Sequence, residues 1–398
     1  MGFFDFHSHA AGRGLSSVYP SLEGVGSLGE ALERVRESLP LAERLKPLIF
    51  LDYDDSTWER EPTKEDLDAV SKEVPIILRR VCGHKAVANS KALELLRDPP
   101  EDGVLLEDDA LHLFSLFPPP DEVMLEAARA AQRELLSLGI TGVREIGSTR
   151  AFKAWRRLEE LGELEVEVEF YFYHEHLGNL KALGLKTSFG EKVKIGGVKA
   201  FLDGSIGART AAFSEPYADT GRKGLLLWEA GHLRQLVEEA ESAGLRLLLH
   251  AIGDEAVSQA LAVYKEVLKK GNPLGHTVEH AEGITPEDLR EAARLGVVLS
   301  FQPNFLQWQG PGGLYERALG PERARRLNPM GSALEEGCRV IFGSDSMPPG
   351  PVYGLRLLEN HPNPSERVKM EESVLHLSLI HISEPTRPRL ISYAVFCL

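Results

Sequence analysis

The 398-residue chain has only three cysteines, Cys82, Cys338 and Cys397, which are too few and too widely spaced for a disulfide framework. A thiolate metal site is not expected either, because no Cys-x-x-Cys pair is present. No apolar run approaches the roughly 18 residues of a membrane span, and no basic segment followed by a long apolar one opens the chain. These absences favour a cytoplasmic protein without a membrane partner.

Clustered positive charge is missing as well. The formal net charge is -15, from 60 Asp and Glu against 45 Lys and Arg. Nucleic acids and anionic membrane surfaces bind through clustered Lys and Arg, so neither is expected as a partner. Hydrophobic residues make up 43% of the chain, which allows one large core or two medium ones.

Five short apolar runs each end in a residue that can bind a metal ion. Each run reads as a buried strand, and a parallel barrel places its active site at the C-terminal ends of its strands. Imidazole and carboxylate donors suit zinc or a similar divalent ion. One such residue alone is more often an ordinary polar residue, but five that share one rule of placement indicate a common site. These residues are His7 with His9, Lys199, His250, His280 and Asp345.

Eight candidate strands, mostly separated by amphipathic helical segments, predict an α/β fold, namely a closed TIM-like (β/α)8 barrel. The strands are expected at Phe3 to His7, Ile140 to Ile146, Val166 to His174, Gly197 to Asp203, Leu245 to His250, His276 to Ala281, Val297 to Gln302 and Val340 to Asp345. Helices are expected at Asp121 to Leu136, His232 to Ala243, Glu255 to Leu268, Thr285 to Leu295, Asn328 to Glu336 and Pro364 to His376.

The barrel is expected to occupy residues 1–376, with an insertion after the first strand. Residues from about 10 to 138 are too many for a simple crossover between strands. Because this segment leaves the catalytic end of the barrel, we expect it to form a lid or a wall of the substrate site.

Several motifs resemble the amidohydrolase superfamily, and within it the amidohydrolase family 3 branch that contains N-substituted formamide deformylase. The most specific is Lys199 to Thr210, which reads Lys-x-Phe-x-Asp-Gly-Ser-x-Gly-x-Arg-Thr. The resemblance runs from about residue 3 to residue 375. Further matching segments are Phe4 to His9, Leu78 to His84 with Asn89 and Ser90, His250 to Asp254, Glu279 to Ala281, Ser300 to Pro303 and Gly343 to Asp345.

This resemblance implies a hydrolase with one or two metal ions that cleaves a carbon-nitrogen bond, of the amide or formamide type, with metal-activated water. It implies that Asp345 also passes a proton from the water to the leaving amine. A cyclic amidine deaminase or cyclic amidohydrolase is an alternative within the superfamily. The implied ligands are His7, His9 and Asp345 for the first ion, His250 and His280 for the second, and Lys199 as a carboxylated bridge.

Lys199 can react with carbon dioxide only as the neutral amine, and burial favours that state by lowering the pKa. Its neighbours Val198, Ala200 and Phe201 are apolar, which fits a buried position. The alternative is an unmodified lysine that contacts the substrate or pairs with a carboxylate, in which case a single ion is expected.

Five further residues are candidates for contact with a small amide-like substrate. We expect His84 to reach the substrate carbonyl, with a structural histidine as the alternative. Asp203 and Arg209 flank a Gly-rich turn and either shape a substrate loop or form a buried ion pair. Gln302 ends the seventh strand and is placed to bind the ligand, and Trp58 is expected either in the pocket or in a core. The sequence leaves a homo-oligomer open.

The chain departs from the family at both ends. Relatives usually carry a small β-sandwich built from segments that flank the barrel, and we expect it to be missing because the first strand starts at Phe3. Residues Leu377 to Arg387 and Ile391 to Leu398 resemble translated sequencing-adapter DNA. We therefore expect residues 377–398 to be a non-native tail. A truncated remnant that binds metal without catalysis is the alternative from another functional class.

If the tail is foreign, deleting Leu377 to Leu398 leaves the chain no less stable, because the deletion removes no native contact. The check is the midpoint of thermal unfolding of both forms. A large loss of folding on deletion contradicts the adapter hypothesis.

Overall fold

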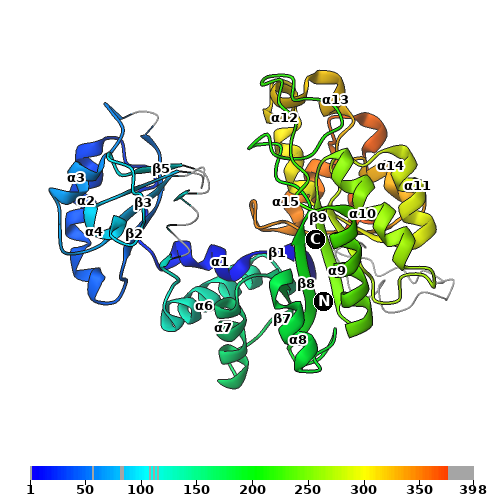
Figure 1. Ribbon diagram of the computed structural model, residues 1–398, viewed down its shortest axis with the longest axis horizontal. Coiled ribbons are helices and arrows are strands. Elements are labelled where there is room, and N and C mark those ends of the chain that lie inside the picture. Colours follow the sequence, from blue (N-terminus) through cyan, green and yellow to red (C-terminus); the bar gives the residue numbers. More distant parts are fainter. Residues whose placement is uncertain are drawn as a thin grey trace. The chain divides into compact units, whose positions relative to one another are not determined.

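A computed structural model describes residues 2–55, 58–80, 85–106, 109–110, 113 and 116–374. Eight of its strands form one parallel sheet in the order β1-β6-β7-β8-β9-β10-β11-β12, which curls into a nearly closed barrel (Figure 1). This confirms the predicted TIM-like fold. The strands are β1 (Phe3–Ser8), β6 (Ile140–Ile146), β7 (Glu167–Tyr173), β8 (Val193–Phe201), β9 (Arg246–Ala251), β10 (Thr277–His280), β11 (Val298–Phe301) and β12 (Arg339–Phe342).

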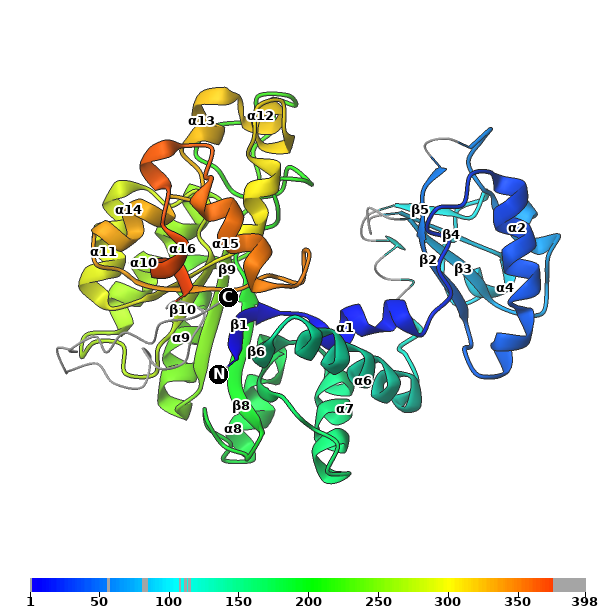
Figure 2. The same ribbon diagram turned by 180° about the vertical axis from the view of Figure 1, so that it is seen from behind.

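Helices alternate with these strands and lie on the outside of the sheet, as Figures 1 and 2 show for α9, α10 and α11. Local sequence sets their ends: the Thr285 side chain accepts the N–H of Asp288 at the start of α11, and Gly296, at φ 65°, ends it. The barrel helices are α8 (Leu177–Ala182), α9 (Ala230–Ala243), α10 (Asp254–Val267), α11 (Pro286–Leu295), α12 (Leu314–Leu319), α13 (Pro321–Arg325), α14 (Met330–Glu335), α15 (Pro351–Glu359) and α16 (Met370–Ser373).

Three predicted elements differ clearly from the structure. The strand expected from Val340 to Asp345 ends at Phe342, so that Asp345 lies in the loop after it. The strand expected from Gly197 starts at Val193 and ends at Phe201, so that Asp203 lies in the loop that follows it. The single helix expected from Pro364 to His376 is wrong, because Arg367 and Lys369 have extended backbones. Up to residue 374, where the described chain ends, this segment forms a 3₁₀ turn, η6 (Pro364–Glu366), and the short α16.

The first and last strands are joined by a buried carboxylate. Asp5 on β1 accepts hydrogen bonds from the Ser344 backbone N–H at 2.8 Å and from its hydroxyl at 2.5 Å. The N–H of Asp345 donates to the carbonyl of His7 at 2.8 Å. Gly343 lies so close to β1 that a Cβ there would be 2.4 Å from the His7 nitrogen. The barrel therefore closes through the loop after β12.

The described chain clusters into two compact units. The barrel unit comprises residues 2–9, 134–148 and 164–374, and the second unit comprises residues 10–133 and 149–163. The second unit has a four-stranded sheet of order β2-β3-β4-β5 over its own apolar core. No helix in the described part of the chain has the length and apolarity to cross a membrane. The strands of the second unit are β2 (Leu48–Tyr53), β3 (Ile76–Arg80), β4 (Lys85–Ala88) and β5 (Val104–Leu106). Its α-helices are α1 (Ala10–Gly14), α2 (Leu28–Glu37), α3 (Lys64–Asp68), α4 (Ser90–Leu93), α6 (Asp121–Ser137, whose last turn enters the barrel unit) and α7 (Thr149–Glu160).

Gly343→Ala is expected to lower the free energy of unfolding by about 2 kcal/mol, because the new methyl group collides with the backbone of His7. Denaturant titration measures the change. Gly178→Ala in α8 is the control, since nothing lies within 4 Å of the added methyl group there and a helical alanine is neutral or stabilising. Equal stability of the two variants contradicts the closure contact.

Candidate metal centre

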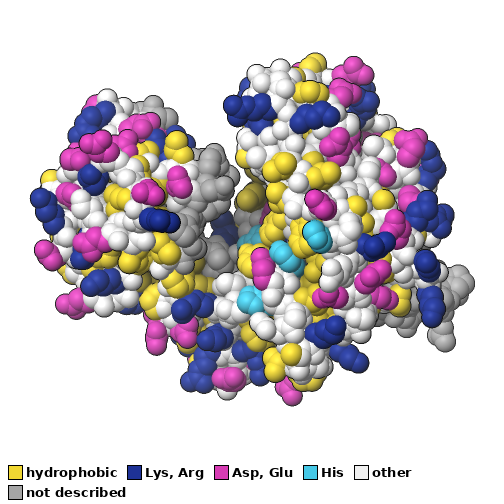
Figure 3. All heavy atoms as spheres, in the orientation of Figure 1, with side chains coloured by type: hydrophobic (Ala, Val, Ile, Leu, Met, Phe, Trp, Pro, Cys, Tyr) yellow, Lys and Arg dark blue, Asp and Glu magenta, His cyan; other side chains and the backbone are white. Residues whose placement is uncertain are grey.

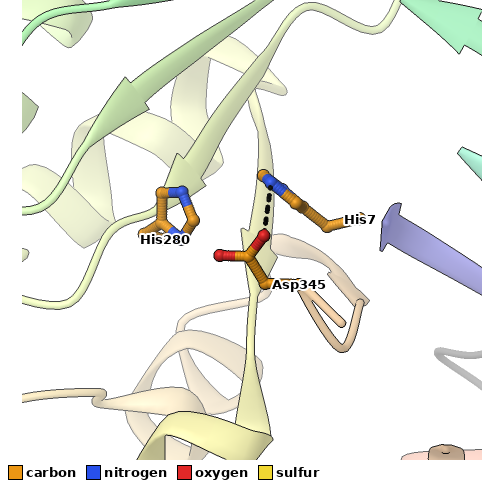
Figure 4. A group of neighbouring side chains, drawn as sticks. All are labelled: His7, His280 and Asp345. Atoms are coloured by element: carbon orange, nitrogen blue, oxygen red, sulfur yellow. Dashed lines mark ion pairs between the residues drawn. The ribbon is translucent and has the colours of Figure 1, made fainter. Parts of the chain in front are cut away.

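The residues at the ends of the apolar runs meet at the C-terminal end of the barrel strands. His7 lies on β1, His280 ends β10 and Asp345 follows β12. One ligand atom from each lies within 4.8 Å of the other two. Figure 4 shows the His7 ring pointing at the Asp345 carboxylate, with His280 nearby. His7 Nε2 lies 3.5 Å from Asp345 Oδ1, and the rings of His7 and His280 lie 4.8 Å apart between centroids. Donor side chains from the first strand, from β10 and from the loop after the last strand therefore lie close together.

The other three predicted ligands border this group. Nε2 of His9 lies 3.2 Å from Oδ1 of Asp345. The ring of His250 on β9 lies 4.5 Å from that of His280, measured between centroids. Lys199 on β8 interacts electrostatically with both Asp345 and His250. The structure thus brings all six residues into one neighbourhood.

Three of the histidines have one ring nitrogen in contact with a carboxylate or a backbone carbonyl oxygen. Histidines that ligate metals commonly donate their other N–H to a carboxylate or a backbone carbonyl, which fixes the ring and its tautomer. The pairs are His7 Nδ1 with Glu279 Oε2 at 2.5 Å, His9 Nδ1 with the Ile146 carbonyl at 2.9 Å, and His250 Nε2 with the Gly204 carbonyl at 2.9 Å.

The backbone at two of the ligands is strained. His280 and Ala281 have φ of 71° and 49°, and Asp345 and Ser346 have φ of 53° and 59°. Positive φ is uncommon outside glycine, and it persists only where surrounding contacts enforce it, frequently at functional sites. Here the hydrogen bond from the Asp345 N–H to the His7 carbonyl is such a contact. The strain turns both side chains away from the path of a regular strand.

Electrostatics favours neutral imidazoles at His7, His250 and His280 and a charged carboxylate at Asp345. His9 differs, because burial on its own would lower its pKa but the hydrogen bond and the charge of Asp345 raise it. Burial lowers the pKa of His7, lowers that of His250 to about 3, and lowers that of His280 well below its usual value. Burial on its own would raise the pKa of Asp345, but its electrostatic interaction with His7 and its hydrogen bond with His9 lower it to about 2. Neutral imidazoles and a carboxylate are the forms that bind a metal ion.

Lys199 is fully surrounded by protein, with 1% of its side chain exposed. Burial lowers the pKa of its amine to about 8. Within the described residues its Nζ has no hydrogen-bond partner, and the ring of Phe201 lies 5.5 Å away. A buried ammonium ion without an acceptor is costly, so this environment shifts the amine toward its neutral form.

These residues fit a divalent metal ion. Buried polar atoms without a partner are rare in folded proteins, yet in the part of the chain described here Lys199 Nζ and His280 Nδ1 are both unsatisfied at this centre. Imidazole nitrogens with a carboxylate oxygen are the donors that zinc and similar borderline ions prefer. The buried atoms without a partner and the chemistry of the donors therefore both indicate a metal site at this position.

Asp203 and Arg209 are occupied by contacts with the protein itself. The buried Asp203 carboxylate accepts the backbone N–H groups of Ala212, Ile252 and Gly253 at 2.8 to 3.3 Å. It therefore ties the loop after β8 to the loop after β9. Arg209 pairs with Asp219 at 2.6 Å rather than with Asp203. Both residues therefore stabilise the Gly-rich loop through contacts with the protein, and they do not form an ion pair with each other.

The remaining predicted contacts fall in three different places. Gln302 follows β11, is buried, and donates from Nε2 to the Ser300 carbonyl at 3.1 Å. Trp58 packs in the core of the second unit, where its indole N–H donates to the Val25 carbonyl at 3.0 Å, so its ring is committed to that core. His84 lies outside the described residues, as does the tail 377–398.

Sequence reasoning missed three acidic residues that support the centre. Glu279 holds His7, Asp5 closes the barrel, and the buried Glu145 at the end of β6 acts electrostatically on His9. Their common signal is an acidic residue inside a run that otherwise reads as a buried strand, because a buried charge needs a partner.

A parallel (β/α)8 barrel with imidazole, carboxylate and lysine side chains at its strand ends is the arrangement expected of a metal-dependent hydrolase. Comparisons with known proteins agree. The profile described as "Amidohydrolase family" matches residues 2–374, so the chain belongs to this family and the resemblance inferred from its motifs is confirmed.

Three relatives illustrate the match. The crystal structure of an uncharacterized metal-dependent hydrolase from Pyrococcus furiosus is 32% identical, with a TM-score of 0.81 over 94% of this chain and 80% of that chain. Another from Pyrococcus horikoshii OT3 is 30% identical, with a TM-score of 0.78 over 95% and 77%. N-substituted formamide deformylase from Arthrobacter pascens is 24% identical over 389 residues, 86% of this chain and 70% of that protein.

Glu279→Gln is expected to weaken metal binding by about 10- to 100-fold, because it removes the charge that orients His7. Competition with a chelator of known affinity measures the effect. Glu241→Gln is the matched control: Glu241 also bonds a buried histidine, His276 at 2.7 Å, but away from the predicted ligands. The same affinity in both variants would remove Glu279 from the support of the centre.

Proposed function

We propose that the protein hydrolyses the carbon-nitrogen bond of a small amide or formamide, other than a peptide bond, with Zn²⁺ or a similar divalent ion. The convergence of His7, His280 and Asp345 within 4.8 Å is the observation that carries this proposal. Membership of the amidohydrolase family supports it. N-substituted formamide deformylase, among the relatives, is named for a reaction of this type.

The donor set has enough members for two ions. A divalent ion supplies two things when it is bound, a lowered pKa of a coordinated water and polarisation of the scissile carbonyl. In the proposed arrangement His7 and His9 bind with Asp345, and His250 binds with His280. The imidazoles of three of these ligands are held in place by other residues: His7 by Glu279, His9 by the Ile146 carbonyl and His250 by the Gly204 carbonyl.

Lys199 is proposed to bridge the two groups of ligands as an N6-carboxylated lysine. The neutral amine forms a bond to the carbon of carbon dioxide as one carbon-oxygen π bond opens, and one N–H proton passes to water, which leaves a carbamate with two oxygen donors. The supporting observations are a buried Nζ without a hydrogen-bond partner and a pKa lowered by burial to about 8. Carboxylation replaces an unsatisfied amine with an anion suited to the neighbouring site.

Asp345 is proposed to carry the proton between the two halves of the reaction. The water oxygen bonds to the carbonyl carbon while one water proton passes to the Asp345 carboxylate. That proton then moves to the substrate nitrogen, the carbon-nitrogen bond breaks, and an amine leaves beside a carboxylic acid. The strained φ of 53° at Asp345 and its hydrogen bond to His7 hold the carboxylate for this task.

Wild-type protein is expected to hold about two zinc-like ions per chain, and Lys199→Ala fewer, because the bridge is lost. Elemental analysis of purified protein measures the ions, and a screen of small amides and formamides measures turnover. Lys194→Ala on the same strand is the control, because its side chain is 37% exposed and pairs with Glu167.

Two results contradict the proposal. A folded wild-type protein without bound metal removes the metal centre. Full turnover of an amide by Lys199→Ala, with unchanged metal content, removes the carbamate bridge and leaves the lysine unmodified.

A further inference from the structure

An exposed group of aromatic and leucine side chains borders the candidate metal centre. This aromatic patch consists of Tyr173 and His174 at the end of β7, Phe201 at the end of β8, and Leu225, Leu227 and Trp228 in the loop before α9. Phe201 is 37% exposed, Leu225 64% and Leu227 55%. Figure 3 shows histidine side chains beside hydrophobic ones on the face where Figure 1 shows β8 and β9.

Backbone contacts keep the patch together. The Trp228 indole N–H donates to the Phe201 carbonyl at 2.9 Å, and its ring meets that of His174 edge-on at 4.9 Å between centroids. The Phe201 ring lies 6.2 Å from that of Tyr173. The Leu227 N–H donates to the Leu202 carbonyl at 2.8 Å. The patch is therefore ordered by the barrel unit itself.

Phe201 connects this patch to the catalytic end of the barrel. The strand register pairs Phe201 with His250, and their rings lie 5.1 Å apart. The same phenyl ring lies 5.5 Å from Nζ of Lys199. A substrate whose amide group sits among the predicted ligands therefore has its substituent within reach of Phe201.

We propose that the aromatic patch binds an aromatic ring carried by the amide substrate, a proposal that rests on the function proposed above. Aromatic rings attract one another in offset and edge-on pairs at centroid distances of about 4.5 to 7 Å, beyond the benefit of apolar burial. Phe201 and Trp228 provide partly open rings for such pairs. Continuity with the predicted ligands favours a substrate ring over a second copy of the chain as the occupant.

The ring can belong to the acyl part or to the amine part of the substrate, so the probes separate the two. N-benzylacetamide carries it on nitrogen, and N-methylphenylacetamide carries it on the acyl side. N-(cyclohexylmethyl)acetamide offers similar apolar area without a π face. Calorimetry on the metal-loaded full chain measures the affinity for each, and steady-state kinetics measures KM and kcat wherever turnover occurs.

Phe201→Leu is expected to weaken binding of at least one aromatic amide about tenfold while changing the cyclohexyl probe less. The amide affected tells which side carries the ring. Trp228→Ala is a second variant, farther from the ligands, and is expected to act in the same direction. Metal content of each variant shows whether the centre is intact.

Phe189→Ala is the matched control, because Phe189 is a 60% exposed phenylalanine in the loop that enters the opposite end of β8. It is expected to bind all three probes like the wild type. Equal affinity of the wild type and Phe201→Leu for both aromatic amides overturns the proposal, as does failure of the wild type to bind either one.

The experiment also separates this inference from the proposed function. Binding of an aromatic amide that depends on Phe201, without turnover of any amide, retains the ring site and contradicts the hydrolase. Turnover of amides with equal efficiency whether or not they carry a ring retains the hydrolase and contradicts the ring site. Conversion of a dimer into a monomer by Trp228→Ala, measured by sedimentation, assigns the patch to a contact between copies and overturns the proposal.

Discussion

The contact between the first and the last barrel strand is the constraint on which the rest depends. Asp5 receives two hydrogen bonds from Ser344, and the carbonyl of His7 receives the N–H of Asp345. His7 lies on the first strand and His9 directly follows it, while Asp345 lies in the loop after the last strand. The interactions that close the barrel are therefore the ones that bring these donors together, and an ion bound by both strands would in turn stabilise the closed barrel.

Burial performs a second task at the centre, since it prepares the protonation states of the donors. It lowers the pKa of His250 and His280, so that these imidazoles stay unprotonated. Glu279 contacts Nδ1 of His7 and fixes the orientation of that ring. The same burial leaves Lys199 without a hydrogen-bond partner among the described residues. Desolvation and orientation thus come from one feature, the packed end of the barrel.

The fold and the donor positions could be predicted because strand periodicity and strand ends are local signals. The contacts that support the site could not be predicted, because they join residues that are distant in sequence and meet only in the folded chain. The sequence places Asp203 beside Arg209, yet its carboxylate binds backbone N–H groups of two loops. Trp58 is predicted either in the pocket or, as is commoner for tryptophan, in a core, and the packing of the second unit places it in the core. The roles of Glu279 and Asp5 could not be predicted either, because each lies within an apolar run and its partner is distant in sequence.

The long stretch of chain between β1 and its neighbour β6 has a consequence for assembly. A nascent chain carries β1 first, but its pairing partner follows after residue 139 and its closing partner only at Ser344. Contacts so distant in sequence are slow to form and cost more loop entropy than local ones. No partly folded barrel can present the complete set of predicted donors. Capture of a metal ion by all of them would therefore report that the barrel has closed.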